Sequence, residues 1–266
     1  MPQQNSPMHN RGLKDDIRDY WSIRAATYDL SPGHGAMTSA EAEAWLALIR
    51  SHLGHGKGRK ALDLGCGTGT MSLLLHRMGF QVTGLDLTEP MMEPARRKAA
   101  EAMAPISFLA ADAENTMEPA AAHDAILARN LFWTLPDPEA ALRDWFRILR
   151  PGGRLMIIDG DFAHLSWLER LAPVLDRLFG KLEDGHSLVT EDQWREHRRI
   201  MAQLPYGKGL RDGDVAALCA RAGFTGLRRE GLGSVLNSRH PNRLSRAALV
   251  ARSQHRFVVS AVKPRA

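Results

Sequence analysis

The stretch Ala61-Leu-Asp-Leu-Gly-Cys-Gly-Thr-Gly-Thr70 is followed, twenty-one residues after its first glycine, by Asp86 in Val82-Thr-Gly-Leu-Asp-Leu87. The apolar run at 60–64 predicts a strand, the segment 71–78 a helix and the run at 81–86 a second strand, which together make one βαβ unit. Three alternating glycines let the backbone turn tightly and approach a ligand where any Cβ would collide. Ligands of such units bind at the carboxyl ends of the strands, so a nucleotide-type site is predicted there.

The two acids of this unit indicate which ligand it binds. Asp86 stands where a carboxylate can accept hydrogen bonds from both ribose hydroxyls. Asp63 lies two residues before the first glycine, where it would repel a pyrophosphate but suits a ligand that carries an ammonium and a sulfonium group. The glycine pattern is G-x-G-x-G, whereas dinucleotide folds have G-x-G-x-x-G. These features favour S-adenosylmethionine as the cofactor, with S-adenosylhomocysteine as its product.

Four further segments accompany the βαβ unit in a definite order. They are Tyr20-Trp-x-x-Arg-Ala-Ala-x-Tyr28-Asp, Phe108-Leu-Ala-Ala-Asp-Ala113, His123-Asp-Ala-Ile-Leu-Ala-Arg-Asn130 and Leu149-Arg-Pro-Gly-Gly-Arg-Leu-Met-Ile-Ile158. With these segments the chain resembles the class I S-adenosylmethionine-dependent methyltransferases of small-molecule type, including those of ubiquinone and menaquinone biosynthesis. The ordered resemblance covers roughly residues 18–160.

The resemblance implies roles for side chains outside the glycine turn. Asp112 would hydrogen-bond the adenine amino group, Ala113 and Met91 would pack against the ring, and Asn130 would face the cofactor from the end of the fourth strand. The predicted cofactor-binding residues are Tyr20, Tyr28, Asp63, Gly65, Cys66, Gly67, Gly69, Asp86, Leu87, Met91, Asp112, Ala113 and Asn130.

Several of these side chains also have a purely structural interpretation. Asp86 could cap a strand end, and Asp112 could be a helix N-cap. Met91 lies on a helical apolar face, where methionine usually belongs to the core. By resemblance Tyr20 and Tyr28 would close over the methionine end of the cofactor. Otherwise they would anchor a helix by burying their rings while the hydroxyl groups stay wet.

The catalytic residues are harder to predict than the cofactor site. A sulfonium is already an activated methyl donor, so the transfer needs alignment and exclusion of water more than acid–base groups. A general base is required only if the acceptor must lose a proton. The candidates are Tyr20, Asp161, His164, His186 and Tyr206, and the sequence does not choose among them. No metal site is predicted.

The order of predicted elements defines the fold class. Strands at 106–110, 124–129 and 154–159 alternate with helices that begin at Pro90 and Asp137, which predicts an α/β, Rossmann-like, mostly parallel seven-stranded sheet with helices on both faces. By resemblance, weak strands at 225–232 and 256–262 form an antiparallel edge. Helices are predicted at 162–179, 190–203 and 212–222. The expected organisation is an N-terminal helical lid over 1–55 and a cofactor-binding methyltransferase domain over 56–266, with 160–208 as a helical insertion on the substrate side.

Composition and charge limit the alternatives. The chain has 266 residues, of which 44% are hydrophobic and 24% charged, as in an ordinary globular protein. No apolar segment predicts a secretory signal or a membrane span, and two cysteines suggest no disulfide scaffold, so a cytoplasmic location is expected. Between residues 195 and 256 there are 13 Lys/Arg against 4 Asp/Glu. This surplus indicates either attraction of an anionic partner or solvated helix faces.

The sequence therefore predicts an enzyme that methylates a small organic acceptor on oxygen, nitrogen, sulfur or carbon. Two alternatives stay open: a membrane-associated lipid or quinone methyltransferase, and a non-catalytic cofactor-binding module. Nucleic acid is not an expected partner, because Arg129-Asn-Leu-Phe-Trp133 replaces the Asn/Asp-Pro-Pro-aromatic motif that nucleic-acid amino-methyltransferases share. A homodimer and peripheral contact with a membrane are left open.

Overall fold

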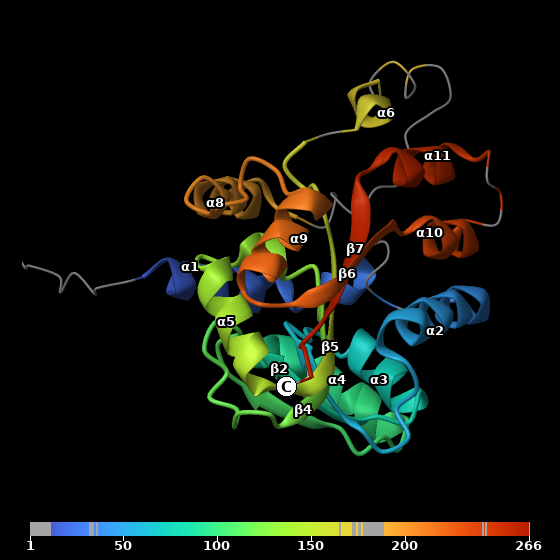
Figure 1. The fold of residues 1–266 in the computed structure, drawn as a ribbon. Coiled ribbons are helices and arrows are strands. Elements are labelled where there is room, and N and C mark those ends of the chain that lie inside the picture. Colours follow the sequence, from blue (N-terminus) through green and yellow to red (C-terminus); the bar gives the residue numbers. More distant parts are fainter. Residues whose placement is uncertain are drawn as a thin grey trace, which may run out of the picture.

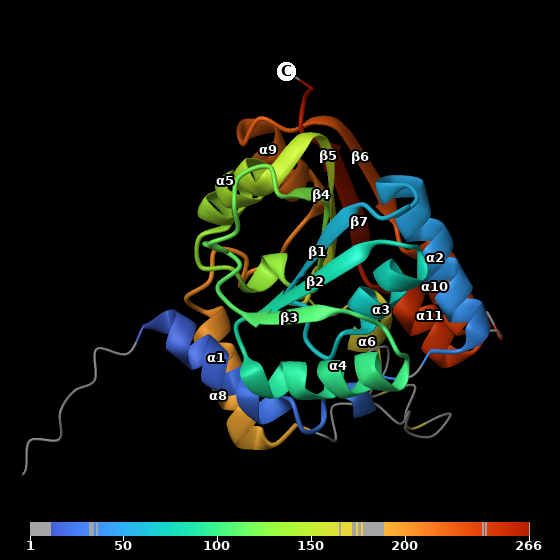
Figure 2. The ribbon, with the colours of Figure 1, turned by 90° about the horizontal axis from the view of Figure 1, so that it is seen from below.

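A computed structural model describes residues 12–31, 35, 37–164, 166–171, 174, 177, 189–240, 242 and 244–265. Its centre is one sheet with the strand order β3-β2-β1-β4-β5-β7-β6 (Figure 2). The first five strands pair in parallel, and β7 lies antiparallel between β5 and β6. The strands are β1 (Lys60–Leu64), β2 (Gln81–Asp86), β3 (Ser107–Ala110), β4 (His123–Arg129), β5 (Leu149–Gly160), β6 (Thr225–Gly231) and β7 (Arg256–Val262).

This arrangement confirms the predicted fold class, a Rossmann-like and mostly parallel seven-stranded sheet whose last two strands form an antiparallel edge. The described helices are α1 (Leu13–Arg24), α2 (Ser39–Leu53), α3 (Thr70–Arg77), α4 (Glu89–Glu101), α5 (Pro138–Ile148), α6 (Trp167–Arg170), α8 (Glu191–Met201), α9 (Asp212–Arg221), α10 (Gly233–Arg239) and α11 (Arg246–Ser253), with short 3₁₀ turns η1 (Tyr28–Leu30) and η2 (Phe132–Thr134).

The central strands are buried on both faces because helices cover each side (Figure 1). Alternate residues of a strand point to opposite faces. In β4, Ile126 packs into the cluster formed with α5 and α9, whereas Leu127 packs into the cluster formed with α2, α3 and α10. Trp145 of α5 and Trp45 of α2 are the largest fully buried side chains of the two layers. The sheet is therefore a rigid platform, and its strand ends have fixed positions.

Three parts of the chain differ from the sequence-based expectation. β5 begins at Leu149, earlier than predicted, because Leu149 pairs with His123 and the pairing then shifts register before it resumes at Arg154. Two helices for which no element was predicted, α10 and α11, lie between β6 and β7, and α10 packs against α2. Of the helix predicted at 162–179, the structure describes α6, which lies beside α11, and single helical positions at 174 and 177.

None of the helices in the described part of the chain is both long and apolar enough to cross a bilayer.

Candidate functional site

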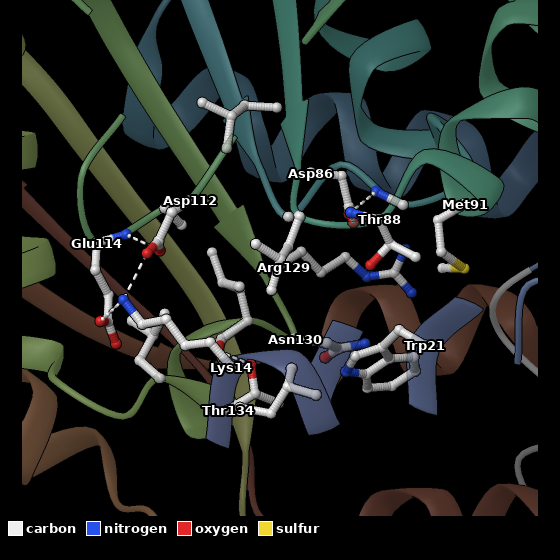
Figure 3. Close-up of a pocket in the computed structure, with 18 of the residues that line it drawn as sticks. Lys14, Trp21, Asp86, Thr88, Met91, Asp112, Glu114, Arg129, Asn130 and Thr134 are labelled. Carbon is white, nitrogen blue, oxygen red and sulfur yellow. Dashed lines mark hydrogen bonds and ion pairs between the residues drawn. The ribbon is translucent and has the colours of Figure 1, made fainter. Parts of the chain in front are cut away.

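A cavity opens at the carboxyl ends of β1, β2 and β4, and α1 lies across it (Figure 3). It encloses about 750 Å³ of space not occupied by protein, including its open mouth. Its walls come from the glycine turn after β1, the segments that follow β2, β3 and β4, and the lid helix. The lining residues are Lys14, Ile17, Trp21, Tyr28, Gly65, Gly67, Leu85, Asp86, Leu87, Thr88, Met91, Asp112, Ala113, Glu114, Arg129, Asn130, Leu131, Thr134, Leu135 and Pro136.

The glycine turn forms one wall of this cavity. Gly65 and Gly67 have φ angles of 61° and 53°, a left-handed conformation that side chains disfavour. A Cβ at Gly67 would lie 3.2 Å from Cε of Met91 and would take up space at the wall of the cavity. Gly69 and Cys66 do not line the cavity: a Cβ at Gly69 would collide with Ala95 of α4, and the Cys66 side chain is buried. The turn thus presents two of its four predicted positions to a ligand.

Asp86 both caps its strand and lines the cavity. Its Oδ2 accepts a hydrogen bond of 2.8 Å from the backbone N–H of Gly67, and its Oδ1 accepts one of 2.9 Å from Thr88. Burial raises the pKa of this carboxyl group. A carboxylate offers more acceptor positions than these two bonds use, and Asp86 lines the cavity. The structural and the ligand-binding interpretations are therefore compatible.

Asp63 is placed differently from the expectation of direct ligand contact. Its carboxylate is buried, accepts a hydrogen bond of 2.6 Å from the Ser72 hydroxyl, and is not among the groups that line the cavity. Burial raises its pKa to about 7. Direct contact between Asp63 and the cofactor stays a prediction.

Lys14 of α1 reaches into the cavity and contacts the predicted adenine site (Figure 3). Its Nζ lies 2.5 Å from Oδ2 of Asp112 and also forms an ion pair with Glu114. Burial opposes a charge on Lys14, but the two carboxylates outweigh it and raise the pKa of this amine. The other oxygen of Asp112 accepts the backbone N–H of Glu114 at 2.9 Å. An adenine amino group would therefore share Asp112 with Lys14.

Arg129 also lines the cavity, although no role was predicted for it from the sequence. Its guanidinium lies 5.1 Å from the ring centroid of Trp45, close enough for a cation–π contact. Burial lowers the pKa of Arg129 and raises that of Tyr28, which also lines the cavity. The signal that could have identified Arg129 is its position at the carboxyl end of a buried parallel strand, directly before Asn130.

Tyr20 lines a second, smaller cavity between α1, η2 and α8. It encloses about 240 Å³ of space, its opening included. Three residues, Ile17, Trp21 and Thr134, line both cavities, so the two are neighbours with a common wall. The lining residues of this second cavity are Ile17, Tyr20, Trp21, Trp133, Thr134, His197, Ile200, Met201 and Leu204.

Of the other catalytic candidates, Asp161, His164 and Tyr206 line neither cavity. Asp161 accepts hydrogen bonds from the backbone of Ala163 and His164 and from Nδ1 of His164, at 2.9–3.2 Å, so it stabilises a turn. The His164 side chain is 53% exposed. Tyr206 packs its ring against Phe132. His186 lies outside the described residues.

About half of the basic residues in the late region pair with acids, several of which lie elsewhere in the fold. Arg239 pairs with Glu41, Arg221 with Glu139, and Arg199 with Asp16. The basic residues of this region with an acidic partner include Arg195, Arg198, Arg199, Arg211, Arg221, Arg229 and Arg239. Pairing of this kind favours the interpretation as solvated helix faces.

The fold is Rossmann-like and is shared with S-adenosylmethionine-dependent methyltransferases of known structure. The structure superimposes on Haemonchus contortus phosphoethanolamine N-methyltransferase 2 with a TM-score of 0.64 at 16% identity, over 96% of this chain and 61% of that one. It superimposes on the [4+2]-cyclase SpnF with a TM-score of 0.63 at 17% identity, over 94% and 96% of the two chains.

Residues 62–157 match the family model described as a methyltransferase domain. Over 103 residues the chain is 39% identical to the demethylmenaquinone methyltransferase of Thermus thermophilus, a match that covers 38% of this chain and 47% of that protein. These matches confirm the resemblance that the sequence motifs indicated. The chain spans about half the length of the curated relatives it matches.

Proposed function

We propose that this protein transfers a methyl group from S-adenosylmethionine to a small organic acceptor. The observation that carries the proposal is the convergence of Gly67, Asp86 and Asp112 on one cavity at the carboxyl ends of parallel strands. The family match over 62–157 supports it, as does the similarity to the demethylmenaquinone methyltransferase of Thermus thermophilus.

The residues of the cavity fit this cofactor. Asp86 offers carboxylate oxygens to ribose hydroxyls, and Asp112 offers one to the adenine amino group. Met91 and Ala113 supply apolar surface for the adenine ring. Gly67 has no Cβ, so the space beside the Met91 methyl group stays open. A Cβ at this position would lie 3.2 Å from Cε of Met91. The guanidinium of Arg129 suits the carboxylate of the methionine end.

When bound, the cofactor supplies a methyl group on a positively charged sulfur. The chain has to hold the reacting groups in line and keep water away from them. Ile17 and Trp21 of α1 form the apolar side of the lid over the cavity, and Lys14 fastens the start of that helix to Asp112 and Glu114. Within the predicted lid region 1–55, we propose that α1 and η1 form the lid, because α2 packs into the core.

A small acceptor is supported by the names of relatives that match the chain, a demethylmenaquinone methyltransferase and a ubiquinone biosynthesis O-methyltransferase. A lipid or membrane substrate has less support, because several of the late arginines are paired with acids. The two cysteines, both buried and without a disulfide, support the proposal of a cytoplasmic location, where thiols stay reduced.

A non-catalytic or differently catalytic site is the second candidate, because a structural neighbour is described as a [4+2]-cyclase. Mass spectrometry of the protein incubated with S-adenosylmethionine and a panel of small phenols, amines and thiols tests the proposal. Formation of S-adenosylhomocysteine together with a product 14 mass units heavier (one methyl in place of hydrogen, about 14 Da) is the expected result. Binding of the cofactor without turnover for any acceptor class would favour the second candidate.

A further inference from the structure

The cavity at the strand ends has two cationic side chains, one on each side. Lys14 pairs with Asp112 and Glu114 at the predicted adenine site. The Arg129 guanidinium lies on the other side of the cavity, toward Met91 (Figure 3). Among the described residues, no other lysine or arginine lines this cavity. Arg129 is therefore the group that an anionic part of a ligand would meet away from the adenine site.

The backbone of β4 fixes the direction of the Arg129 side chain. Arg129 is the last residue of the strand and pairs with Ile158 of β5. The next residue, Asn130, donates its backbone N–H to the Ile158 carbonyl at 2.8 Å. Alternate residues of a strand point to the same face, so Arg129 points to the face of Leu127, which packs into the cluster formed with α2. Trp45 of α2 belongs to that cluster and is 1% exposed.

Trp45 presents its ring face to Arg129. The ring centroid lies 5.1 Å from the guanidinium carbon. Buried indole N–H groups usually have a hydrogen-bond partner, but within the described part of the chain no group accepts a hydrogen bond from Nε1 of Trp45. A guanidinium over an aromatic face keeps its N–H donors along its edge, because the contact involves the ring face alone. The ring of Trp45 can therefore orient Arg129 while the edge of the guanidinium binds a ligand.

The Arg129 guanidinium is charged although it is buried. Burial is the main cause that lowers its pKa, and the charge of Arg239 lowers the pKa further. Tyr28, Glu41 and Asp63 act in the opposite direction. An arginine keeps its proton in proteins at ordinary pH. A ligand carboxylate placed beside this group would form a charge-assisted pair, which is stronger in a buried site than in water.

We propose that Trp45 is a positioning residue that holds Arg129 so that its guanidinium binds a ligand carboxylate. The pair makes the cavity prefer nucleoside thioethers with a complete amino-acid end over those that lack the carboxylate.

This proposal rests on the cofactor binding of the proposed function and adds a residue outside the cavity that sets ligand preference. Trp45 does not line the cavity, so its effect on a ligand has to pass through Arg129. The planar fork of a guanidinium matches the two oxygens of a carboxylate, and a fixed guanidinium loses less freedom when it binds.

Two ligands that differ by one carboxylate test this role. They are S-adenosylhomocysteine and its decarboxylated form, which keeps the amine, the sulfur and the nucleoside. The variants are Arg129→Met, Trp45→Leu and Trp45→Phe. The control is Phe80→Leu, because Phe80 is also buried and has Arg59 at 5.2 Å in the same kind of contact, while neither residue lines the cavity. Calorimetry measures both affinities on the same preparation of each protein, so any loss of folded protein affects both ligands alike.

The losses should be specific for the carboxylate. Arg129→Met should weaken S-adenosylhomocysteine binding by about 10- to 100-fold, because a charged hydrogen-bonded pair is lost, and binding of the decarboxylated ligand by less than about threefold. Trp45→Leu should weaken S-adenosylhomocysteine binding by about 3- to 30-fold, with a similarly small change for the decarboxylated ligand. Trp45→Phe should keep most of the preference, because it restores a ring face. Phe80→Leu should keep the wild-type ratio of the two affinities.

Equal losses for the two ligands, or no loss, in either Arg129→Met or Trp45→Leu would overturn the proposal. If Trp45→Phe behaved like Trp45→Leu, the ring face would not be what holds Arg129. Methyl transfer by the wild type together with unchanged affinity ratios in these variants would contradict this proposal alone. Failure of the wild type to bind S-adenosylhomocysteine would instead contradict the proposed function.

Discussion

The Asp86 carboxylate accepts the backbone N–H of Gly67 at 2.8 Å, so the end of β2 holds the glycine turn that follows β1. The same carboxylate binds the backbone N–H of Thr88 at the start of α4. One side chain therefore fixes two backbone segments and still faces the cavity. The parallel pairing of β1 and β2 brings the two residues together, so the sheet determines the geometry of the proposed cofactor site.

Replacing Asp86 should weaken cofactor binding without unfolding the protein. Asp86→Ala removes charge-assisted hydrogen bonds to the ribose, and we expect a loss of about 1–3 kcal/mol in S-adenosylhomocysteine affinity. Asp86→Asn is the matched control, because it keeps the shape and one acceptor oxygen and should lose less. Calorimetry at equal protein concentration measures both. Unchanged affinity of the alanine variant would show that Asp86 does not contact the ligand.

Replacing Gly67 by alanine should lower cofactor affinity, whereas the same replacement at a glycine with a similar φ angle should not. Gly67→Ala carries a left-handed penalty of about 1–2 kcal/mol and also places its Cβ 3.2 Å from Cε of Met91. Gly226 has a similar φ of 60°, but a Cβ there would meet no atom closer than 3.6 Å. Both alanine variants should lose stability in thermal melts, and only Gly67→Ala should also lose cofactor affinity. Equal affinities would place Gly67 away from the ligand.

Removing the Lys14 side-chain charge should loosen the lid. Lys14→Met breaks the ion pairs with Asp112 and Glu114 that fasten α1, and for a partly exposed pair we expect a cost of up to about 1 kcal/mol. Hydrogen exchange of residues 13–24 in the ligand-free protein should then accelerate by up to about fivefold. Arg18→Met is the control, because Arg18 pairs with the exposed Asp15 of its own helix. If both variants exchange like the wild type, the ion pairs do not hold the lid.

The buried Asp63 carboxyl should make stability fall as pH rises. Its pKa is about 7 in the folded protein and 3.8 in the unfolded reference, so between these values the folded state binds more protons. The free energy of unfolding then decreases with pH over this window, by up to about 1.4 kcal/mol per pH unit for one group. Asp63→Asn removes the group while Ser72 can reverse its hydroxyl to stay bonded.

Urea titrations between pH 5 and pH 8 (roughly one unit inside and one unit beyond the window) measure this effect. We expect the stability of Asp63→Asn relative to the wild type to rise across this range, since Asp159, whose pKa burial also raises to about 7, is common to both proteins. Parallel curves for the two proteins would mean that Asp63 does not titrate in this window.

The sequence predicted the local parts of this structure better than the long-range ones. The βαβ unit and its glycine turn were predicted because strand, turn and helix lie within thirty residues and each has its own pattern. The helices α10 and α11, of seven and eight residues, were missed, because short helices depend on tertiary packing. The prediction of a helix at 162–179 rested on leucine spacing, and the structure describes only part of that range, including α6.

The same limit applies to the site. Asp86 and Asp112 follow strands with clear patterns, so their position at the cavity could be predicted. Lys14 contacts Asp112 from 98 residues away, and no local pattern indicates such a pair. The ring of His197 lies next to that of Tyr20 because α8 packs on α1. Nothing in the sequence distinguishes His197 from the other ten of the eleven histidines.

Calorimetric titration of the full chain with S-adenosylmethionine, S-adenosylhomocysteine and NAD tests the central claim most directly. We expect the first two to bind in the micromolar range that is usual for cofactors, each to displace the other, and NAD to give no heat. No heat with either sulfur compound together with tight binding of NAD would contradict the account and make this cavity a dinucleotide site.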